Sequence, residues 1–318
     1  MLSLAILPFA LALTGALAAP SGAPAARDEF PVTQSVVALP ARFVDGDIIL
    51  RLAIAGRNLD FVLDSGASSI IIDRDVARDL GLPNAPLGPA AEMDPAAATP
   101  VDVAEIAIGD LTVRNAVASA LPFAYEAKDH TVIAGLLGYD FLAGAVVHVD
   151  YRHQRVFAIA PGAFDPDVPG ATSVPITLED GVPMVSVRVG NASGDRFIVD
   201  SGADDVYLFD RFARAHPRDI VDRRGAVTQF SSLAYRGDDG APARMSLIAV
   251  DVDDFTFADI DFRHFLAYRV AAFDGDADVD PDGLIGYRFL RYYDLYFDYP
   301  AARLILAPND LATHGLRR

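Results

Sequence analysis

Residues 61–67 read FVLDSGA, and residues 197–203 read FIVDSGA. In each stretch, apolar residues lead into an aspartate that is followed by serine and glycine, which is typical of a buried strand ending in a tight turn. The two aspartates, Asp64 and Asp200, are 136 positions apart. This match indicates an internal duplication, so the fold depends on what else repeats around it.

Two further blocks repeat in the same order. Residues 135–142 (GLLGYDFL) return as 283–290 (GLIGYRFL), now 148 positions apart, and the dipeptide Asp-Tyr at 150–151 returns at 298–299. Three ordered matches predict a duplicated unit of about 130 residues, an ordinary size for a domain. The separation grows by 12 residues between the first and second blocks. We expect these extra residues of the second copy to lie in loops.

Both copies are rich in predicted strands. Residues 47–54 and 58–63 flank Gly56 and predict a hairpin, which residues 182–189 and 196–199 repeat in the second copy. Prolines and glycines without apolar periodicity separate the copies and predict a linker. We therefore expect an all-β, bilobal fold of two homologous β-barrel-like lobes with short helices and a cleft between them. The expected division is residues 35–162 for the N-terminal lobe, 163–169 for the linker and 170–310 for the C-terminal lobe.

Asp-Ser-Gly-Ala at the end of an apolar strand resembles the catalytic turn of the pepsin and retropepsin superfamily of aspartic proteases. The resemblance covers about residues 43–308 and implies that two retropepsin-like lobes share one chain, each giving one catalytic aspartate, Asp64 and Asp200. Two carboxyl groups forced together share a proton and divide into acid and base, which is what metal-free peptide hydrolysis requires. The resemblance implies supporting roles in the catalytic turns for Ser65, Gly66, Ser201 and Gly202.

The two copies differ just beyond this motif. The second copy continues with Asp204 and resembles the retroviral form, in which the matching aspartate contacts the substrate backbone, whereas the first copy has Ser68. Both positions are therefore expected to bind substrate, in unequal half-sites. Tyr139 and Tyr287 stand where retroviral enzymes usually carry arginine, so the ion pair within each lobe is not expected. Neither copy has a tyrosine-containing flap signature, and no flap residue is assigned.

Composition restricts the partners. The formal net charge of −18 argues against nucleic acid, because phosphate binding needs a basic surface. No basic amphipathic stretch predicts attachment to a membrane. The resemblance implies a peptide or protein substrate, no cofactor and no metal. Because both halves of the site are in one chain, a monomer is expected.

The first residues predict export. Residues 2–17 are almost wholly apolar, and small residues at 16 and 18 predict cleavage of a signal peptide, residues 1–18, before Ala19. Residues 19–34 then form an N-terminal linker. The expected location is the periplasm or the outside of the cell. The chain has no cysteine, so it has neither disulfides nor thiol chemistry.

Other interpretations of the same residues were weighed. Residues 278–289 begin like a calcium loop, but the twelfth position is Phe289 where a carboxylate is needed. His148 and His153 flank Asp150, yet no second cluster of metal ligands accompanies them. A bilobal peptide-binding protein that does not cleave is the main alternative function. A purely structural pair of β-domains is a third.

Overall fold

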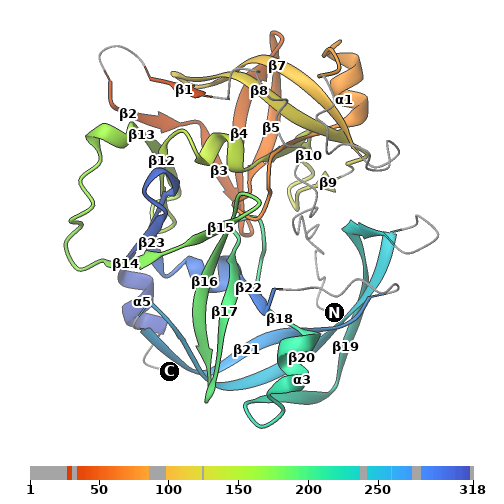
Figure 1. Cartoon of the computed structure of the whole chain (residues 1–318), viewed down its shortest axis with the longest axis vertical. Helices are drawn as coiled ribbons and strands as arrows, with labels where there is room; N and C mark the ends of the chain where they lie inside the picture. The colour runs from red at the N-terminus through yellow and green to blue at the C-terminus, as the bar shows by residue number, and fades with distance from the viewer. Residues whose placement is uncertain are drawn as a thin grey trace.

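The computed structural model of the chain describes residues 27–30, 34–85, 98–123, 125–236, 242–258, 260–273 and 281–315. Figure 1 shows two lobes stacked along the long axis, the N-terminal lobe above and the C-terminal lobe below. The expected signal peptide, residues 1–18, lies outside the described residues. Among the residues described, no helix is long and apolar enough to cross a bilayer.

The N-terminal lobe is built on an eight-stranded sheet. The strands follow the order β1-β8-β6-β11-β5-β4-β3, and β7 pairs with β4 and β8. Helices α1 and α2 follow β6 and β11, and a separate small hairpin joins β9 to β10. The bounds are β1 Arg27–Glu29, β3 Ala41–Val44, β4 Asp47–Ile54, β5 Arg57–Leu63, β6 Ile70–Asp73, α1 Arg74–Asp79, β7 Thr99–Ile108, β8 Leu111–Leu121, β9 Tyr125–Glu126, β10 Val132–Ile133, β11 Gly135–Leu137 and α2 Tyr139–Leu142.

The C-terminal lobe repeats most of this topology, because β15-β16-β17-β22-β18-β21 matches β3-β4-β5-β11-β6-β8, whereas β1 and β19 have no counterpart among the described strands of the other lobe. Its sheet has the order β15-β16-β17-β22-β18-β21-β20-β19, and the extra pairing of β16 with β20 matches that of β4 with β7. The expected all-β, bilobal fold class is confirmed. The bounds are β15 Thr177–Glu179, β16 Val182–Val189, β17 Ala192–Val199, β18 Val206–Phe209, α3 Asp210–Ala215, β19 Ile220–Arg236, β20 Pro242–Phe257, β21 Ile260–Phe273, β22 Gly283–Ile285 and α4 Tyr287–Leu290.

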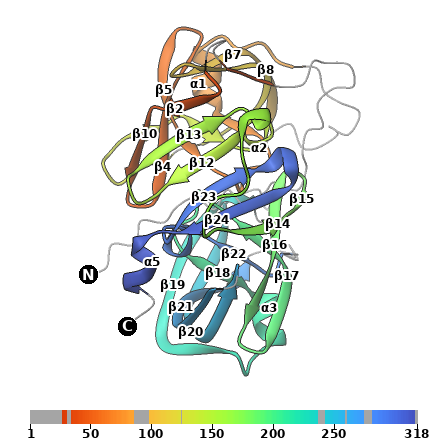
Figure 2. The same cartoon turned by 90° about the vertical axis from the view of Figure 1, so that its left-hand side faces the viewer.

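A third sheet belongs to both lobes. Its order is β14-β24-β23-β12-β13-β2, so strands from the two copies meet where β12 pairs with β23. Figure 2 shows this sheet between the lobes. The bounds are β2 Val36–Leu39, β12 Val146–Asp150, β13 Arg155–Ile159, β14 Thr172–Pro175, β23 Tyr293–Asp298 and β24 Arg303–Pro308, with 3₁₀ helices η1 Pro161–Ala163 and η2 Tyr299–Ala301 and the C-terminal helix α5 Asp310–Gly315.

The extra residues of the second copy were expected to lie in loops. They lie mainly in a hairpin instead. Gly109 and Ala258 begin the equivalent turns after β7 and β20, both with positive φ, and they are already 149 positions apart. The insertion therefore precedes that turn, within the hairpin of β19 and β20. These arms have 17 and 16 residues, whereas β7 has 10. The hydrogen bonds of a hairpin allow both arms to lengthen together, so extra residues need not form a loop.

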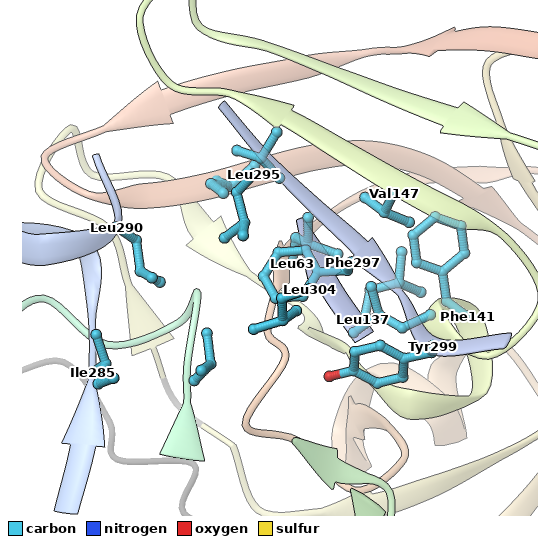
Figure 3. Packing of buried hydrophobic residues seen from close by; sticks show 14 of the residues in the cluster. Leu63, Leu137, Phe141, Val147, Ile285, Leu290, Leu295, Phe297, Tyr299 and Leu304 are labelled. Carbon is cyan, nitrogen blue, oxygen red and sulfur yellow. The ribbon is translucent and has the colours of Figure 1, made fainter. Parts of the chain in front are cut away.

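One hydrophobic core runs through both lobes. It includes Leu63 and Leu137 of the first copy, Ile285 of the second copy and Phe297 of the shared sheet in a single cluster (Figure 3). Burial of continuous apolar surface is the main favourable term in folding. The two lobes are consequently packed as one body around the ends of β5 and β17, where the sequence places its two aspartates.

Candidate active site

Each aspartate sits at the end of a central strand, held by the strand beneath it. Leu137 O accepts a hydrogen bond from Asp64 N at 3.1 Å, and Ile285 O accepts one from Asp200 N at 2.9 Å. These acceptors lie on β11 and β22, which pair in parallel with β5 and β17. The apolar-apolar-Gly blocks of the sequence thus lie under the two turns. Gly135 has no room for a side chain, because an added Cβ would lie 2.0 Å from Ile71 O.

The two serines tie the turns together reciprocally. Ser65 N donates to Ser201 Oγ at 3.0 Å, and Ser201 N donates to Ser65 Oγ at 2.9 Å. Each hydroxyl then donates to a carbonyl of the opposite lobe: Ser65 Oγ to Val199 O, and Ser201 Oγ to Leu63 O, both at 2.8 Å. Both side chains are fully buried. Buried polar groups of this kind are stable only when every donor finds an acceptor, so the four bonds fix the lobes in one register.

The glycines let the carboxyl groups meet. A Cβ added to Gly66 would lie 2.6 Å from Asp200 Oδ2, and one added to Gly202 would lie 2.7 Å from Asp64 Cγ. Each carboxyl group therefore lies over the glycine of the other turn. Each also accepts a hydrogen bond from its own glycine N–H, at 2.9 Å for Asp64 and 2.8 Å for Asp200. The sequence-predicted residues Ser65, Gly66, Ser201 and Gly202 are thus all brought to this one site.

The two carboxyl groups differ in proton affinity. Both side chains are 2% exposed. Burial, the charge of Asp200 and a hydrogen bond with it raise the pKa of Asp64 well above its usual range. Burial also raises the pKa of Asp200, to about 6. Hydrogen bonds from the Gly202 N–H and from Asp64 oppose this shift and limit it. Both shifts favour the protonated form, so the two carboxyl groups are expected to share a proton as a pair.

The two other predicted residues lie at unequal flanks. Asp204 is half-buried and accepts a hydrogen bond from the hydroxyl of Tyr207. Ser68 is half-buried in the equivalent turn of the other lobe. The structure brings Asp204 near Asp47 of the N-terminal lobe, a residue that the sequence analysis missed. Its signal was present: Asp47 follows an Asp-Gly turn whose second copy leads into Val182 instead.

The ion pair within a lobe, which the sequence analysis did not expect, is present in the C-terminal lobe. Arg288 Nη2 lies 2.9 Å from Asp205 Oδ2, one position beyond the tyrosine that replaces the usual arginine. Asp205 Oδ1 also accepts Val206 N at 3.1 Å. In the N-terminal lobe the equivalent N–H, that of Ile70, donates to Asp140 Oδ2 instead, at 3.1 Å.

Nothing described suggests a metal centre. His148 stacks on Tyr296 with ring centroids 4.0 Å apart, whereas His153 bonds through Nδ1 to Asp150 at 2.9 Å. Within the described ranges, no three histidine or acidic side chains are grouped as metal ligands. The first positions of the calcium-like stretch fall outside those ranges, and its later residues form β22 and α4.

Comparison with known proteins agrees with this geometry. Residues 50–141, a segment of the N-terminal lobe, match the family described as "Aspartyl protease". No curated protein sequence matches the chain.

Similar solved structures include two that match along most of the chain. The aspartic proteinase from Irpex lacteus is 14% identical over 89% of this chain and 100% of its own, with a TM-score of 0.47. Basic 7S globulin from soybean is 11% identical over 88% and 97%, with a TM-score of 0.45. A retropepsin-like aspartic protease from Rickettsia conorii is 18% identical over 43% and 89%, with a TM-score of 0.29. Similarity this distant does not bear on the reaction.

Proposed function

We propose that this protein is an aspartic endopeptidase that hydrolyses peptide bonds with one water activated between Asp64 and Asp200. The observation that supports the proposal best is the reciprocal bonding of Ser65 and Ser201, which holds two buried carboxyl groups over each other's glycines. Such a costly arrangement of buried acids is what an acid–base pair needs, and no structural role requires it.

In the proposed reaction the shared proton lies on Asp64, which has the more strongly raised pKa, and this gives the two carboxyl groups different roles. Asp200, as the ionised carboxylate, takes a proton from the water as its oxygen attacks the scissile carbonyl carbon. Asp64 gives its proton to the carbonyl oxygen, so a neutral tetrahedral diol forms without a charged intermediate. The proton held by Asp200 then goes to the leaving nitrogen as the carbon–nitrogen bond breaks, while Asp64 recovers its proton from the diol. No cofactor enters this scheme.

The substrate is a peptide bound in extended form. The end of the buried strands is flanked by apolar clusters in both lobes, which include Ile49 and Ile71 in one and Met184 and Tyr207 in the other. A strand-like peptide presents alternate side chains to such surfaces and is held through its backbone. The main alternative, a peptide-binding protein that does not cleave, has the same requirements except the paired acids.

The test is hydrolysis of a random peptide library by the purified chain between pH 3 and pH 8. Asp64→Asn and Asp200→Asn are each expected to lower kcat/KM by at least about 10³-fold, because each removes half of one acid–base pair. Asp75→Asn, an exposed aspartate on α1, is the control and should change nothing. Binding without cleavage by the wild type would favour the alternative function, and a half-active single variant would contradict a single shared site.

We further propose that the protein is exported and that its mature form begins near Ala19. The support is the apolar stretch and the small-residue cleavage pattern of residues 1–18, together with a chain that needs no thiol. Mass spectrometry of the protein from the periplasmic or external fraction should give the mass of residues 19–318. An uncleaved chain found only in the cytoplasm would contradict the proposal.

A further inference from the structure

Two carboxyl groups distinguish one half of the site from the other. Asp204 lies four positions after Asp200, where the first copy has Ser68. Asp47 is the first residue of β4 after the turn Asp45-Gly46, whereas the first residue of β16 after the equivalent turn is Val182, fully buried. One half therefore has two acids at positions where the other half has a hydroxyl and an apolar side chain.

The contact between the lobes brings these two acids to the same place. A Cβ added to Gly46 would lie 3.0 Å from the ring of Tyr287, so the turn before Asp47 packs against the start of α4. Tyr287 N donates to Ala203 O at 2.7 Å, which places Asp204 beside that ring. The charge of Asp204 acts on both Asp47 and Tyr125, which agrees with this proximity.

Asp47 has no ion-pair partner among the described side chains. Its side chain is 3% exposed, and its Oδ2 accepts the hydroxyl of Tyr125 at 2.5 Å. Its Oδ1 has no hydrogen-bond partner among the residues described. The neighbour Asp204 likewise accepts a tyrosine hydroxyl, that of Tyr207. A hydroxyl donor satisfies one oxygen but leaves the negative charge in place, and a buried acceptor without a partner is costly.

Three described cations of this region form ion pairs with other acids. Lys128 forms an ion pair with Asp45, Arg42 with Asp129, and Arg288 with Asp205. Lys128 and Arg288 do lower the proton affinity of Asp204, yet among the described side chains neither forms an ion pair with Asp47. The combination of Asp47 and Asp204 is therefore short of positive charge, and an arriving cation would complete it.

We propose that Asp47 and Asp204 bind a cationic side chain, lysine or arginine, of the substrate peptide on one side of the scissile bond only. The proposal rests on the proposed function. The hydrogen bond from Ala203 N to Asp200 O keeps Asp204 within about 10 Å of Asp200. An extended peptide advances about 3.3 Å per residue, so the cation belongs within about three residues of the bond that is cut.

The first experiment compares peptides that carry lysine or its uncharged analogue norleucine at each position within three residues of the cleaved bond. At pH 7 the wild type should cleave the lysine peptide about tenfold faster, by kcat/KM, at one position and on one side only, the effect of one partly buried ion pair. Asp47→Asn and Asp204→Asn should each remove most of this preference. Asp47→Asn keeps an oxygen for the Tyr125 hydroxyl, so the variant should fold, and its thermal transition checks this.

The matched control lies in the opposite half. Asp180→Asn alters the turn equivalent to Asp45-Gly46, at a residue whose positive φ asparagine also adopts, and should leave the preference intact. Equal preferences on the two sides of the bond, or a preference that survives both Asp47→Asn and Asp204→Asn, would overturn the proposal.

A second measurement separates this proposal from the proposed function. Reduced-amide peptides, which cannot be hydrolysed, are titrated into the full chain by calorimetry, again as lysine and norleucine pairs. Suppose that the chain cleaves no peptide, and that Asp47→Asn lowers the affinity for lysine peptides alone. The cation site is then supported and the endopeptidase assignment is contradicted. If peptides are cleaved and bound without regard to charge, the cation site falls and the endopeptidase assignment stands.

Discussion

At the scale of single residues, each serine of the two Asp-Ser-Gly turns acts as donor and acceptor at once. Ser65 Oγ receives the N–H of Ser201 and donates to Val199 O, and the pattern repeats with the lobes exchanged. Loss of one hydroxyl would leave a buried N–H and a buried carbonyl unpaired, each costing about 1–3 kcal/mol. Serine is thus required here by the hydrogen bonds that join two lobes, and turn propensity alone would not require it.

The ionisation of Asp200 links the acid pair to stability. Its pKa rises from 3.8 in the unfolded chain to about 6 in the fold, so its contribution to stability is full below pH 4 and is lost as the pH passes 6. Asp200→Asn removes this loss. The unfolding free energy of the variant should therefore exceed that of the wild type by an amount that grows between pH 4 and pH 7, to about 3 kcal/mol. The melting temperature of the variant should rise above that of the wild type over the same range. Scanning calorimetry at several pH values checks this, and a pH-independent difference would contradict it.

Some residues of the candidate site could be predicted from the sequence, and others could not. Asp64 and Asp200 could be found because each sits in a contiguous motif that occurs twice. Asp47 could not be found as readily, because an aspartate next to an Asp-Gly turn is common in turns and does not indicate a binding site. Its partner Asp204 is 157 positions further on. Only the packing of one lobe on the other brings the two together.

At the scale of elements, the two copies use different residues to accept a hydrogen bond from the same backbone N–H. The first N–H of β6 and of β18 needs an acceptor inside the lobe. Asp140 on α2 supplies it to β6, whereas Asp205 in the turn supplies it to β18 and is then balanced by Arg288 on α4. The exchange is complete, since the first copy has Ser69 where the second has Asp205.

This exchange predicts a coupling between two positions. Asp205→Ser removes the acceptor of Val206 N, and Arg288→Asp leaves Asp205 beside another acid, so each single variant should be destabilised. The double variant copies the N-terminal lobe and should regain much of the loss, with a coupling energy of at least about 1 kcal/mol. Urea denaturation of the four proteins measures the cycle, and additive losses would show that the two solutions are not equivalent.

The lengths of the elements were less accessible to prediction than their order. The hairpin of β4 and β5 could be predicted because apolar residues flank Gly56 closely. The arms β19 and β20 pair over a long distance with irregular register, including shifts between Asp222 and Val227. Such shifts break the alternation on which strand prediction depends, so the extra residues of the second copy looked like loop.

At the scale of the whole molecule, the lobes interlock through equivalent contacts. Tyr139 of the first copy packs on Tyr299 of the second, with ring centroids 6.3 Å apart, and Tyr287 packs on Tyr151 at 5.9 Å. Contacts exchanged in this way are the mark of a two-fold interface, here within one chain. The sequence revealed the repeat but not this interface, because pairings between distant segments leave no local pattern.

The shared sheet predicts that the covalent linker is dispensable once the protein has folded. Residues 164–171 join the lobes without any regular element after η1. If a protease site is inserted there and cut, the two fragments should remain together in gel filtration, because β12 stays paired with β23. Light scattering before cutting should give the mass of one chain. Separation of the fragments in native buffer would contradict the prediction.

The pairing of β12 with β23 also determines how the proposed activity would depend on dilution. A site shared by two separate chains is lost when its halves dissociate, so its specific activity falls at low protein concentration. Here both halves are tethered, and the effective concentration of one lobe around the other is fixed by a linker of a few residues. Each molecule therefore carries a complete site however dilute the solution, which would suit a protein that leaves the cell that makes it.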